Sequence, residues 1–161
     1  TGQRLRDCVS MKWESLNLKE GSWNLVQGKT GKRLCVPLAE SLSGHLRTCK
    51  RGQRGFVMRT LGGRGTGGKY GTTGGGLSDE FARLLVRSGI QRKVIRSTCR
   101  RVYDVSFHSL RHTFDSMLAN KGVTREVRER LGIAEGRVHV VYEHLEEDFL
   151  RQTVNLIPFV G

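Results

Sequence analysis

A histidine and an arginine stand one helical turn apart in the sequence, at a place where a helix is expected to begin. His108 and Arg111 belong to the run Phe-His-Ser-Leu-Arg-His-Thr-Phe, whose apolar positions continue at helical spacing. The N–H groups of a helix N-terminus, with a guanidinium on the same face, form a good site for a phosphate. An isolated pair of this kind is more often a structural histidine and a surface arginine, so the interpretation depends on the rest of the chain.

The same run offers a weaker interpretation as a metal site. His108 and His112 are spaced i, i+4, and two such side chains could bind zinc from one helix face. No third ligand has an obvious spacing, and the pattern His-Glu-x-x-His does not occur. The glycine-rich stretch 52–76 likewise has no GxxxxGK[ST] spacing for nucleotide phosphates. We therefore expect neither a metal nor a cofactor.

Short motifs elsewhere in the chain complete a recognisable pattern. They are Thr-Gly-Gln-Arg-Leu-Arg-Asp at 1–7, Gly-Lys-Thr-Gly-Lys at 28–32 followed by Val-Pro-Leu at 36–38, His-Ser-Leu-Arg-His at 108–112, and Leu131-Gly132 with Tyr142 eleven residues after Leu131. In kind, order and spacing, these motifs resemble those of the tyrosine recombinase or phage integrase family, in its Xer-like catalytic domain. The resemblance spans nearly the whole chain, and it includes His144 as part of a Tyr-x-His motif.

The resemblance implies a nucleophile and a clamp for the phosphate. Tyr142 would attack phosphorus and form a 3′-phosphotyrosyl bond, while Arg4 and Arg111 would hold the scissile phosphate. The chemistry is sound in itself, because a phenol with a pKa of about 10 needs cationic neighbours or a base to become a nucleophile. Tyr70 and Tyr103 lack the surrounding motif and are not expected to take this role.

The resemblance also implies supporting roles, and it exposes one departure. Lys29 would protonate the leaving 5′ oxygen, His108 would act as general acid–base or orient a proton, and Asp7 would support the site. After Leu-Gly the family carries His, or sometimes Trp, but this chain has Ile133, which has no hydrogen-bond donor. A phosphate contact is expected to be missing there. His139 could compensate, although a position on the surface is the more common interpretation of such a histidine.

Positive charge is concentrated in the middle of the chain. The formal net charge is +13, and the stretch from Arg47 to Arg101 holds fourteen Lys and Arg against two acids, Asp79 and Glu80, which is +12 in itself. Such a field favours a polyanion, so the expected partner is double-stranded DNA. The residues expected to contact DNA are Arg92, Lys93, Arg96, Arg100 and Arg101.

The expected fold is α+β and mainly α, a helical core with a small three-stranded antiparallel sheet. Alternating, turn-bounded stretches predict strands at 13–18, 22–27 and 33–38. Apolar periodicity predicts helices at 3–12, 39–50, 77–88 and 109–121. It also predicts one that Thr124 caps and Leu131-Gly132 ends, and a last one carrying Tyr142. Ser78 is expected to cap the helix 77–88, and the stretch 52–76 to be a flexible loop.

The length of 161 residues fits one catalytic domain over 1–161. Its first residues read like the middle of a domain, so we expect the protein to extend upstream, where the family carries a core-binding domain that is absent here. No apolar run is long enough to cross a bilayer. The four cysteines form no CxxC pair and suggest reduced thiols in a bacterial or phage-infected cytoplasm, near the nucleoid.

Three functions remain open at this point. The first is site-specific strand exchange by an integrase that self-associates as a tetramer on DNA, without a membrane. The second is a DNA-binding relic that no longer cleaves, which Ile133 suggests. The third is relaxation of supercoils by similar chemistry, as in type IB topoisomerases. An assay for strand exchange, binding alone, or relaxation at any sequence separates them.

Overall fold

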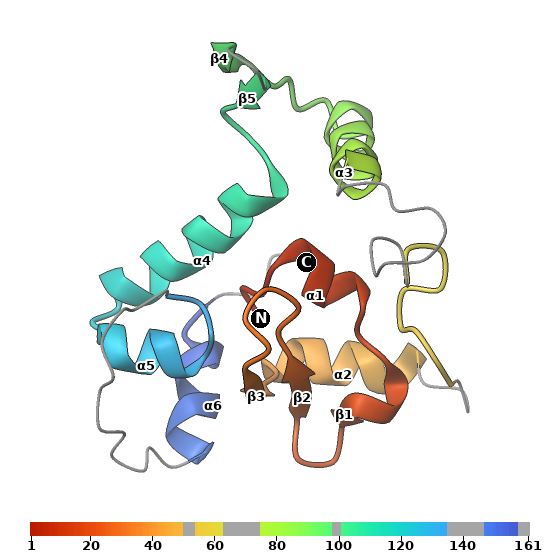
Figure 1. Ribbon diagram of the computed structural model, residues 1–161. Helices are drawn as coiled ribbons and strands as arrows, with labels where there is room; N and C mark the ends of the chain where they lie inside the picture. The colour runs from red at the N-terminus through yellow and green to blue at the C-terminus, as the bar shows by residue number, and fades with distance from the viewer. Residues whose placement is uncertain (50–53, 63–74, 98–100, 135–146, 158–161) are drawn as a thin grey trace.

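The computed structural model describes residues 1–49, 54–62, 75–97, 101–134 and 147–157. Within these ranges the chain is mainly helical with one three-stranded antiparallel sheet, as the sequence predicts (Figure 1). The helix expected to carry Tyr142 lies outside the described residues. Among the helices described, none is long and apolar enough to span a membrane.

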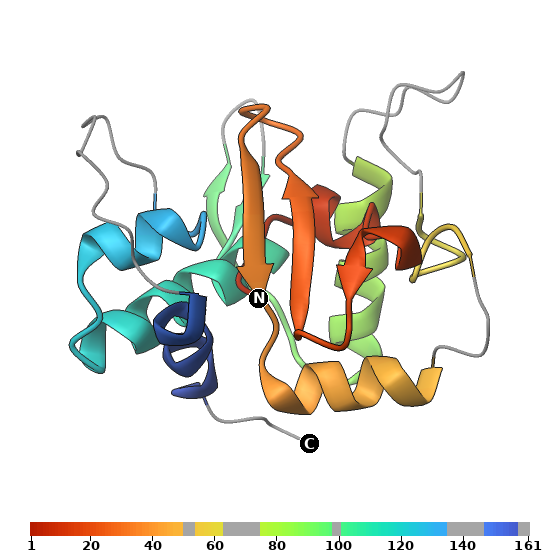
Figure 2. The same cartoon turned by 90° about the horizontal axis from the view of Figure 1, so that it is seen from below.

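The three-stranded sheet forms one half of the body. Its strands are β1 (Leu16–Asn17), β2 (Ser22–Val26) and β3 (Arg33–Pro37), in the order β1-β2-β3, all antiparallel. The first strand is shorter than predicted because Trp13–Ser15 forms a 3-10 turn, η1. In Figure 2 the strands lie side by side with α2 (Glu40–Cys49) beneath them.

Apolar residues of the sheet and α2 form a first core, here called the sheet cluster. Alternate residues of β2 and β3 point inward, which is why polar and apolar residues alternate along both strands. The members are Met11, Trp13, Leu16, Leu18, Trp23, Leu25, Leu34, Val36, Leu38 and Leu46. The preceding helix α1 (Leu5–Val9) leads the chain into this cluster and is shorter than predicted.

Helices form a second core, here called the helical cluster. It is built from α4 (Phe107–Asn120), α5 (Arg125–Arg130), the turn after α5, and α6 (Glu147–Asn155). Its buried members are Leu118, Val127, Leu131, Ile133, Leu150 and Val154. Thr124 stands at the N-cap position of α5, as predicted, and α6 contributes Leu150 and Val154 to this cluster.

An arm of three elements extends from the start of α4. It consists of α3 (Gly75–Arg87), β4 (Val94–Ser97) and β5 (Arg101–Tyr103), and it lies apart from the three-stranded sheet (Figure 1). The prediction that Ser78 caps α3 was wrong, because this helix begins three residues earlier at Gly75. The β4–β5 hairpin was not predicted, since its strands are too short to show a clear alternation.

Part of the expected flexible loop is held against the body. Residues 54–62 are described, and Lys12 and Phe56 form an isolated antiparallel bridge. Trp13 N donates to the Gly55 carbonyl oxygen at 2.9 Å, and Val57 N donates to that of Met11 at 2.9 Å. Residues 52–53 and 63–74 of the stretch lie outside the described residues, and 75–76 begin α3.

Candidate active site

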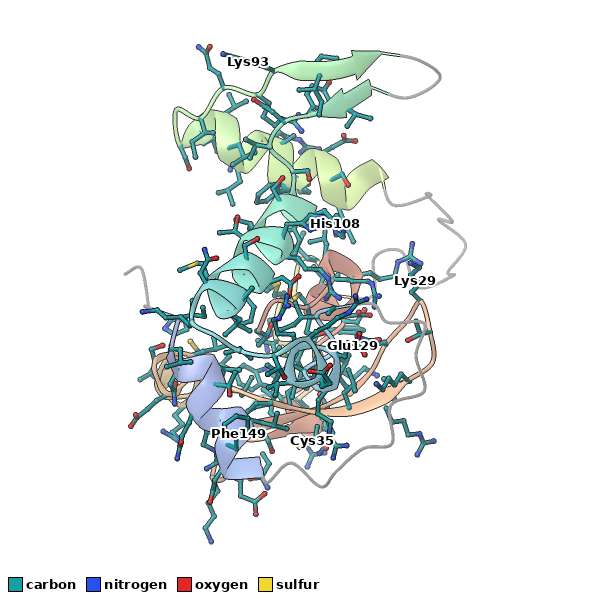
Figure 3. The ribbon with its side chains drawn as sticks, turned by 90° about the vertical axis from the view of Figure 1, so that its left-hand side faces the viewer. Lys29, Cys35, Lys93, His108, Glu129 and Phe149 are labelled. Atoms are coloured by element: carbon teal, nitrogen blue, oxygen red, sulfur yellow. The ribbon has the colours of Figure 1, made fainter. Side chains whose placement is uncertain are left out.

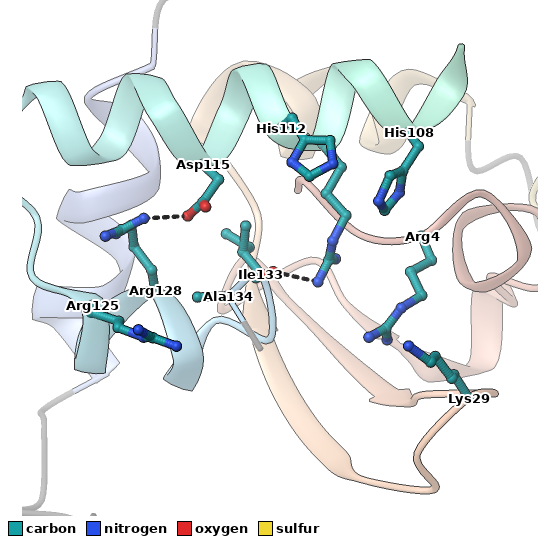
Figure 4. Close-up of a pocket in the computed structure, with 10 residues that line it drawn as sticks. Arg4, Lys29, His108, His112, Asp115, Arg125, Arg128, Ile133 and Ala134 are labelled. Atoms are coloured by element: carbon teal, nitrogen blue, oxygen red, sulfur yellow. Dashed lines mark hydrogen bonds and ion pairs between the residues drawn. The ribbon is translucent and has the colours of Figure 1, made fainter. Parts of the chain in front are cut away.

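A polar cavity of about 650 Å³ opens between the sheet and the helices. Five residues that the sequence pattern singled out lie around it, although they are far apart in the chain (Figure 4). Among the described residues, the lining consists of Arg4, Lys29, His108, Arg111, His112, Asp115, Arg125, Arg128, Ile133 and Ala134. Most of these side chains are basic, so the cavity is suited to an anion.

Asp7 lies behind the cavity, and its carboxylate contacts Arg4 and the hairpin turn that carries Lys29. Its side chain is buried, and its Oδ1 accepts a hydrogen bond from Gly28 N at 2.9 Å. Its Oδ2 lies 3.9 Å from Arg4 Nη1. The carboxylate therefore holds Arg4 and the hairpin turn that carries Lys29 in one arrangement, and Figure 4 shows the Lys29 amine and the Arg4 guanidinium pointing toward each other.

The start of α4 places two histidines at the edge of the cavity. Ser106 precedes the helix, and its N–H donates to Ser109 Oγ at 3.0 Å, which fixes the first turn. His108 lies in that turn, as predicted, and is exposed. The rings of His108 and His112 meet edge to face with centroids 4.5 Å apart.

Arg111 is the most deeply placed cation of the cavity. Its side chain is only 5% exposed. Nη1 donates to the Gly2 carbonyl oxygen at 2.9 Å, and Nη2 donates to the carbonyl oxygens of Gly132, at 2.8 Å, and Ile133. A guanidinium has five N–H donors, and these bonds use three of them. Arg111 thus joins the N-terminal segment to the turn after α5 while it lines the cavity.

The side chain of Ile133 lies in the helical cluster and also in the cavity wall. It is 4% exposed and packs in the helical cluster, and it also lines the cavity beside Ala134. Among the described residues, this part of the lining offers the cavity a hydrocarbon surface. Where the family pattern has His or Trp, this chain therefore places an apolar side chain in the wall of a basic cavity.

The sequence did not predict the part of the lining that Asp115 and the arginines of α5 form. Arg128 Nη1 pairs with Asp115 Oδ1 at 2.6 Å, and Arg125 Nε with Glu129 Oε1 at 2.9 Å. Asp115 follows Arg111 by four residues on the same helix, a spacing that could have indicated it. The arginines of α5 had no such signal, because only tertiary packing brings them to the cavity.

The residues expected to contact DNA along the arm are distributed along its length. Arg92 lies over the Tyr103 ring at 4.1 Å and lines a neighbouring cavity of about 260 Å³ that also reaches Arg4 and His108. Lys93 is exposed on the arm, on the side away from α6 (Figure 3). Arg96 and Arg101 belong to β4 and β5. Arg100 and the proposed nucleophile Tyr142 lie outside the described residues, as do His139 and His144.

Burial changes one titratable group beside the site. The Cys8 thiol lies near the Gln3 carbonyl oxygen, 3.7 Å away, and desolvation by burial raises its pKa. A raised pKa keeps the thiol protonated and unreactive at neutral pH. Within the described ranges, no group of three His, Cys, Asp or Glu side chains is arranged to hold a metal ion.

Residues 1–148 match the model of the phage integrase family. The chain belongs to that family. Membership implies DNA as the partner of the domain. The integrase of mycobacterium phage Brujita has a similar fold, with a TM-score of 0.60 and 19% identity over 98% of this chain and 47% of that one. This match confirms the expected fold class.

Two curated proteins show the same relationship at the level of sequence. The tyrosine recombinase XerD of Ralstonia nicotianae is 29% identical over 153 residues, 94% of this chain and 47% of that protein. The tyrosine recombinase XerC of Xylella fastidiosa is 27% identical over 151 residues, 93% of this chain and 47% of that protein. This integrase-family chain thus spans about half the length of the curated relatives it matches.

Proposed function

We propose that the chain is the catalytic domain of a site-specific DNA recombinase, which cleaves and rejoins DNA through a 3′-phosphotyrosyl bond. One observation carries the proposal. Arg4, Lys29, His108 and Arg111 come from three distant segments, yet they line one cavity. By resemblance, each of these residues also stands in a motif of the integrase family, and the chain belongs to that family.

In this proposal the cations act on one phosphodiester. The oxygen of Tyr142 attacks phosphorus, the bond to the 5′ oxygen breaks, and Lys29 donates a proton to that leaving oxygen. Arg4 and Arg111 offset the charge that grows on the non-bridging oxygens, which is where phosphoryl transfer needs help most. Asp7 keeps Arg4 and the Lys29 turn in place through its two contacts.

His108 completes the proton transfers. Its exposed ring stands in the first turn of α4, so it can reach a phosphate oxygen or the attacking phenol as general acid–base. The 3′ phosphate stays bonded to Tyr142 until a free 5′ hydroxyl attacks it and releases the phenol. The covalent bond conserves the energy of the phosphodiester, so rejoining needs no ATP.

The test is the covalent intermediate itself. The protein is incubated with a nicked suicide duplex, from which the leaving strand diffuses away, and the products are separated in SDS. We expect a protein–DNA adduct with the wild type and none with Tyr142→Phe, which keeps its affinity for DNA. An adduct of normal yield from Tyr142→Phe would place the nucleophile elsewhere, with Tyr103 and Tyr70 the next to test.

A second candidate function is favoured by Ile133. A DNA-binding protein that no longer cleaves would tolerate a hydrocarbon wall where the resemblance expects a donor. Tight DNA binding without any adduct would support this candidate. Recombination of paired sites, with a tetrameric synapse, would support the first, while relaxation of supercoils at any sequence would indicate a topoisomerase-like activity.

A further inference from the structure

Two buried glutamines join segments that surround the cavity. The two glutamine side chains themselves are not part of its lining. Gln3 is 1% exposed and Gln27 is 4% exposed, although glutamine is mostly found at protein surfaces. A buried primary amide needs hydrogen-bond partners, because desolvating it without them costs free energy. The partners of these two side chains therefore show what the burial achieves.

Both amide groups donate to the turn after α5. Gln3 Nε2 donates to the Leu131 carbonyl oxygen at 2.7 Å, and Gln27 Nε2 donates to that of Gly132 at 3.1 Å. The two glutamines also touch each other, with Gln27 Nε2 3.4 Å from Gln3 Oε1. These contacts connect positions more than 100 residues apart in the chain.

Gln27 is also fixed from the hairpin side. Thr30 Oγ1 donates to Gln27 Oε1 at 2.9 Å, and Gly31 N donates to the Gln27 carbonyl oxygen at 2.8 Å. Lys29 lies between these contacts, in the same turn. Any shift of the Lys29 turn is therefore transmitted through one side chain to the turn after α5.

The backbone at Gly132 packs very closely against the side chains of Leu34 and Gln27. Gly132 has a φ of +74°, and a Cβ there would lie 2.3 Å from Leu34 Cδ1 and 2.8 Å from Gln27 Nε2. Only glycine accepts both this conformation and this approach. The chain continues from Gly132 to Tyr142 within ten residues.

We propose that Gln3 and Gln27 are positioning residues for the proposed cleavage reaction. They set the register between the Lys29 turn, which supplies the proton for the leaving oxygen, and the turn from which the chain proceeds to the nucleophile. The inference rests on the proposed function, and it assigns to these amides a role in geometry rather than in contact with DNA. A misplacement of about 1 Å can slow a reaction about 10²-fold.

A purely structural role makes a different prediction. In that case the loss of either amide acts only through global stability, and a core substitution of similar cost has the same effect. Leu46→Ala provides this comparison, because Leu46 is buried in the sheet cluster away from the cavity. Gln152→Met provides the chemical comparison, because Gln152 is exposed on α6.

The experiment uses the whole chain and the nicked suicide duplex, with a single-turnover rate of adduct formation and a separate Kd for the same duplex. Gln27→Met keeps the volume of the side chain and removes its donors. We expect adduct formation to slow about 10²-fold with an unchanged Kd. Thr30→Val, an exposed position that orients Gln27, should slow it in the same direction and guards against a variant that fails to fold.

Amide exchange gives a readout that does not need cleavage. The N–H groups of Gly132 and Ile133 bond to carbonyl oxygens of α5, and they should exchange faster in Gln27→Met, while those of β2 and β3 stay protected. The positioning role alone would be overturned if Gln27→Met and Thr30→Val formed the adduct at the wild-type rate. It would also be overturned if Leu46→Ala slowed adduct formation as much as they do. A wild type that forms no adduct rejects the proposed function, and the positioning role with it.

Discussion

Ile133 shows how one residue can serve the fold and the site at once. Its side chain completes the helical cluster, and the same side chain forms an apolar part of the cavity wall. Its backbone carbonyl oxygen accepts a hydrogen bond from Arg111. A substitution here must therefore be judged by stability and by chemistry separately.

We expect Ile133→His to speed single-turnover adduct formation, because the imidazole supplies a donor toward a non-bridging oxygen. One such donor is typically worth on the order of 10²–10³ in rate. DNA affinity should change little, and stability should fall by about 1–3 kcal/mol, since a polar ring replaces buried hydrocarbon. Urea unfolding measures the second effect.

The matched control for that prediction is Ile133→Val, which removes one methylene and adds no donor. It should leave the rate of adduct formation unchanged and cost about 0.5–1.5 kcal/mol of stability. If Ile133→His slows a fast wild type, the site works around isoleucine, and His139 becomes the residue to replace next.

The resemblance to the family, carried by short motifs, was enough to predict the cavity residues that lie on the N-terminal segment, the hairpin turn and the start of α4. Arg4, Lys29, His108 and Arg111 were predicted from short motifs, and the structure brings them together. The carbonyl partners of Arg111 were not predictable. Gly2 precedes it by 109 residues, and contacts at such separation depend on packing that no local pattern encodes.

At the scale of elements, the β4–β5 hairpin is the feature with the clearest consequence for DNA. Its strands contain the exposed Val94, Ile95 and Val102 as well as Arg96 and Arg101. The hairpin lies at the end of the arm opposite α6 (Figure 3). Arg92 stacks on Tyr103, and Asp104 Oδ1 accepts a hydrogen bond from Lys93 N at 2.8 Å. The base of the hairpin is thus ordered by local contacts.

Replacing Arg92, Lys93 and Arg96 together by glutamine should weaken DNA binding and flatten its salt dependence. Each lost phosphate contact reduces the slope by about 0.9 log units of affinity per log unit of salt. The slope is measured by titrating a labelled duplex at several salt concentrations. Replacement of Lys19, Arg33 and Lys121, exposed residues outside the arm, removes the same charge and serves as the control.

Equal slopes for the two triple variants would show that only net charge matters and that the arm does not follow the phosphate backbone. The hairpin itself was missed at the sequence level for a physical reason. Strands of three or four residues bury little, so their side chains need not alternate between apolar and polar. The longer helix α4 was predicted closely because its periodic face packs on the body.

At the scale of the whole molecule, polar side chains lie between the two core clusters. The sheet cluster and the helical cluster are joined there by Gln3, Gln27 and Arg111. The helical cluster also depends on α6, which contributes Leu150 and Val154 from the end of the chain. The helices of this core therefore pack together with a segment that is distant in the chain.

Leu150→Ala should destabilise the protein by about 2–5 kcal/mol, because it removes a buried side chain from the helical cluster. Phe149→Ala, at the adjacent and 47% exposed residue, should change stability far less. Urea unfolding of both variants, followed by circular dichroism, checks the difference. Equal losses would mean that α6 does not pack as the structure has it.

The three carbonyl contacts of Arg111 limit what the presence of this arginine can say about an integrase gene found in a genome. A lineage that abandons DNA cleavage still needs this arginine, because its guanidinium holds the first residues of the domain to the turn after α5. Purifying selection on folding then preserves the residue after selection on chemistry has ended. Under the proposed function, an intact arginine at this position is therefore a poor marker of DNA cleavage, whereas loss of Lys29 or Tyr142 would be the more informative sign.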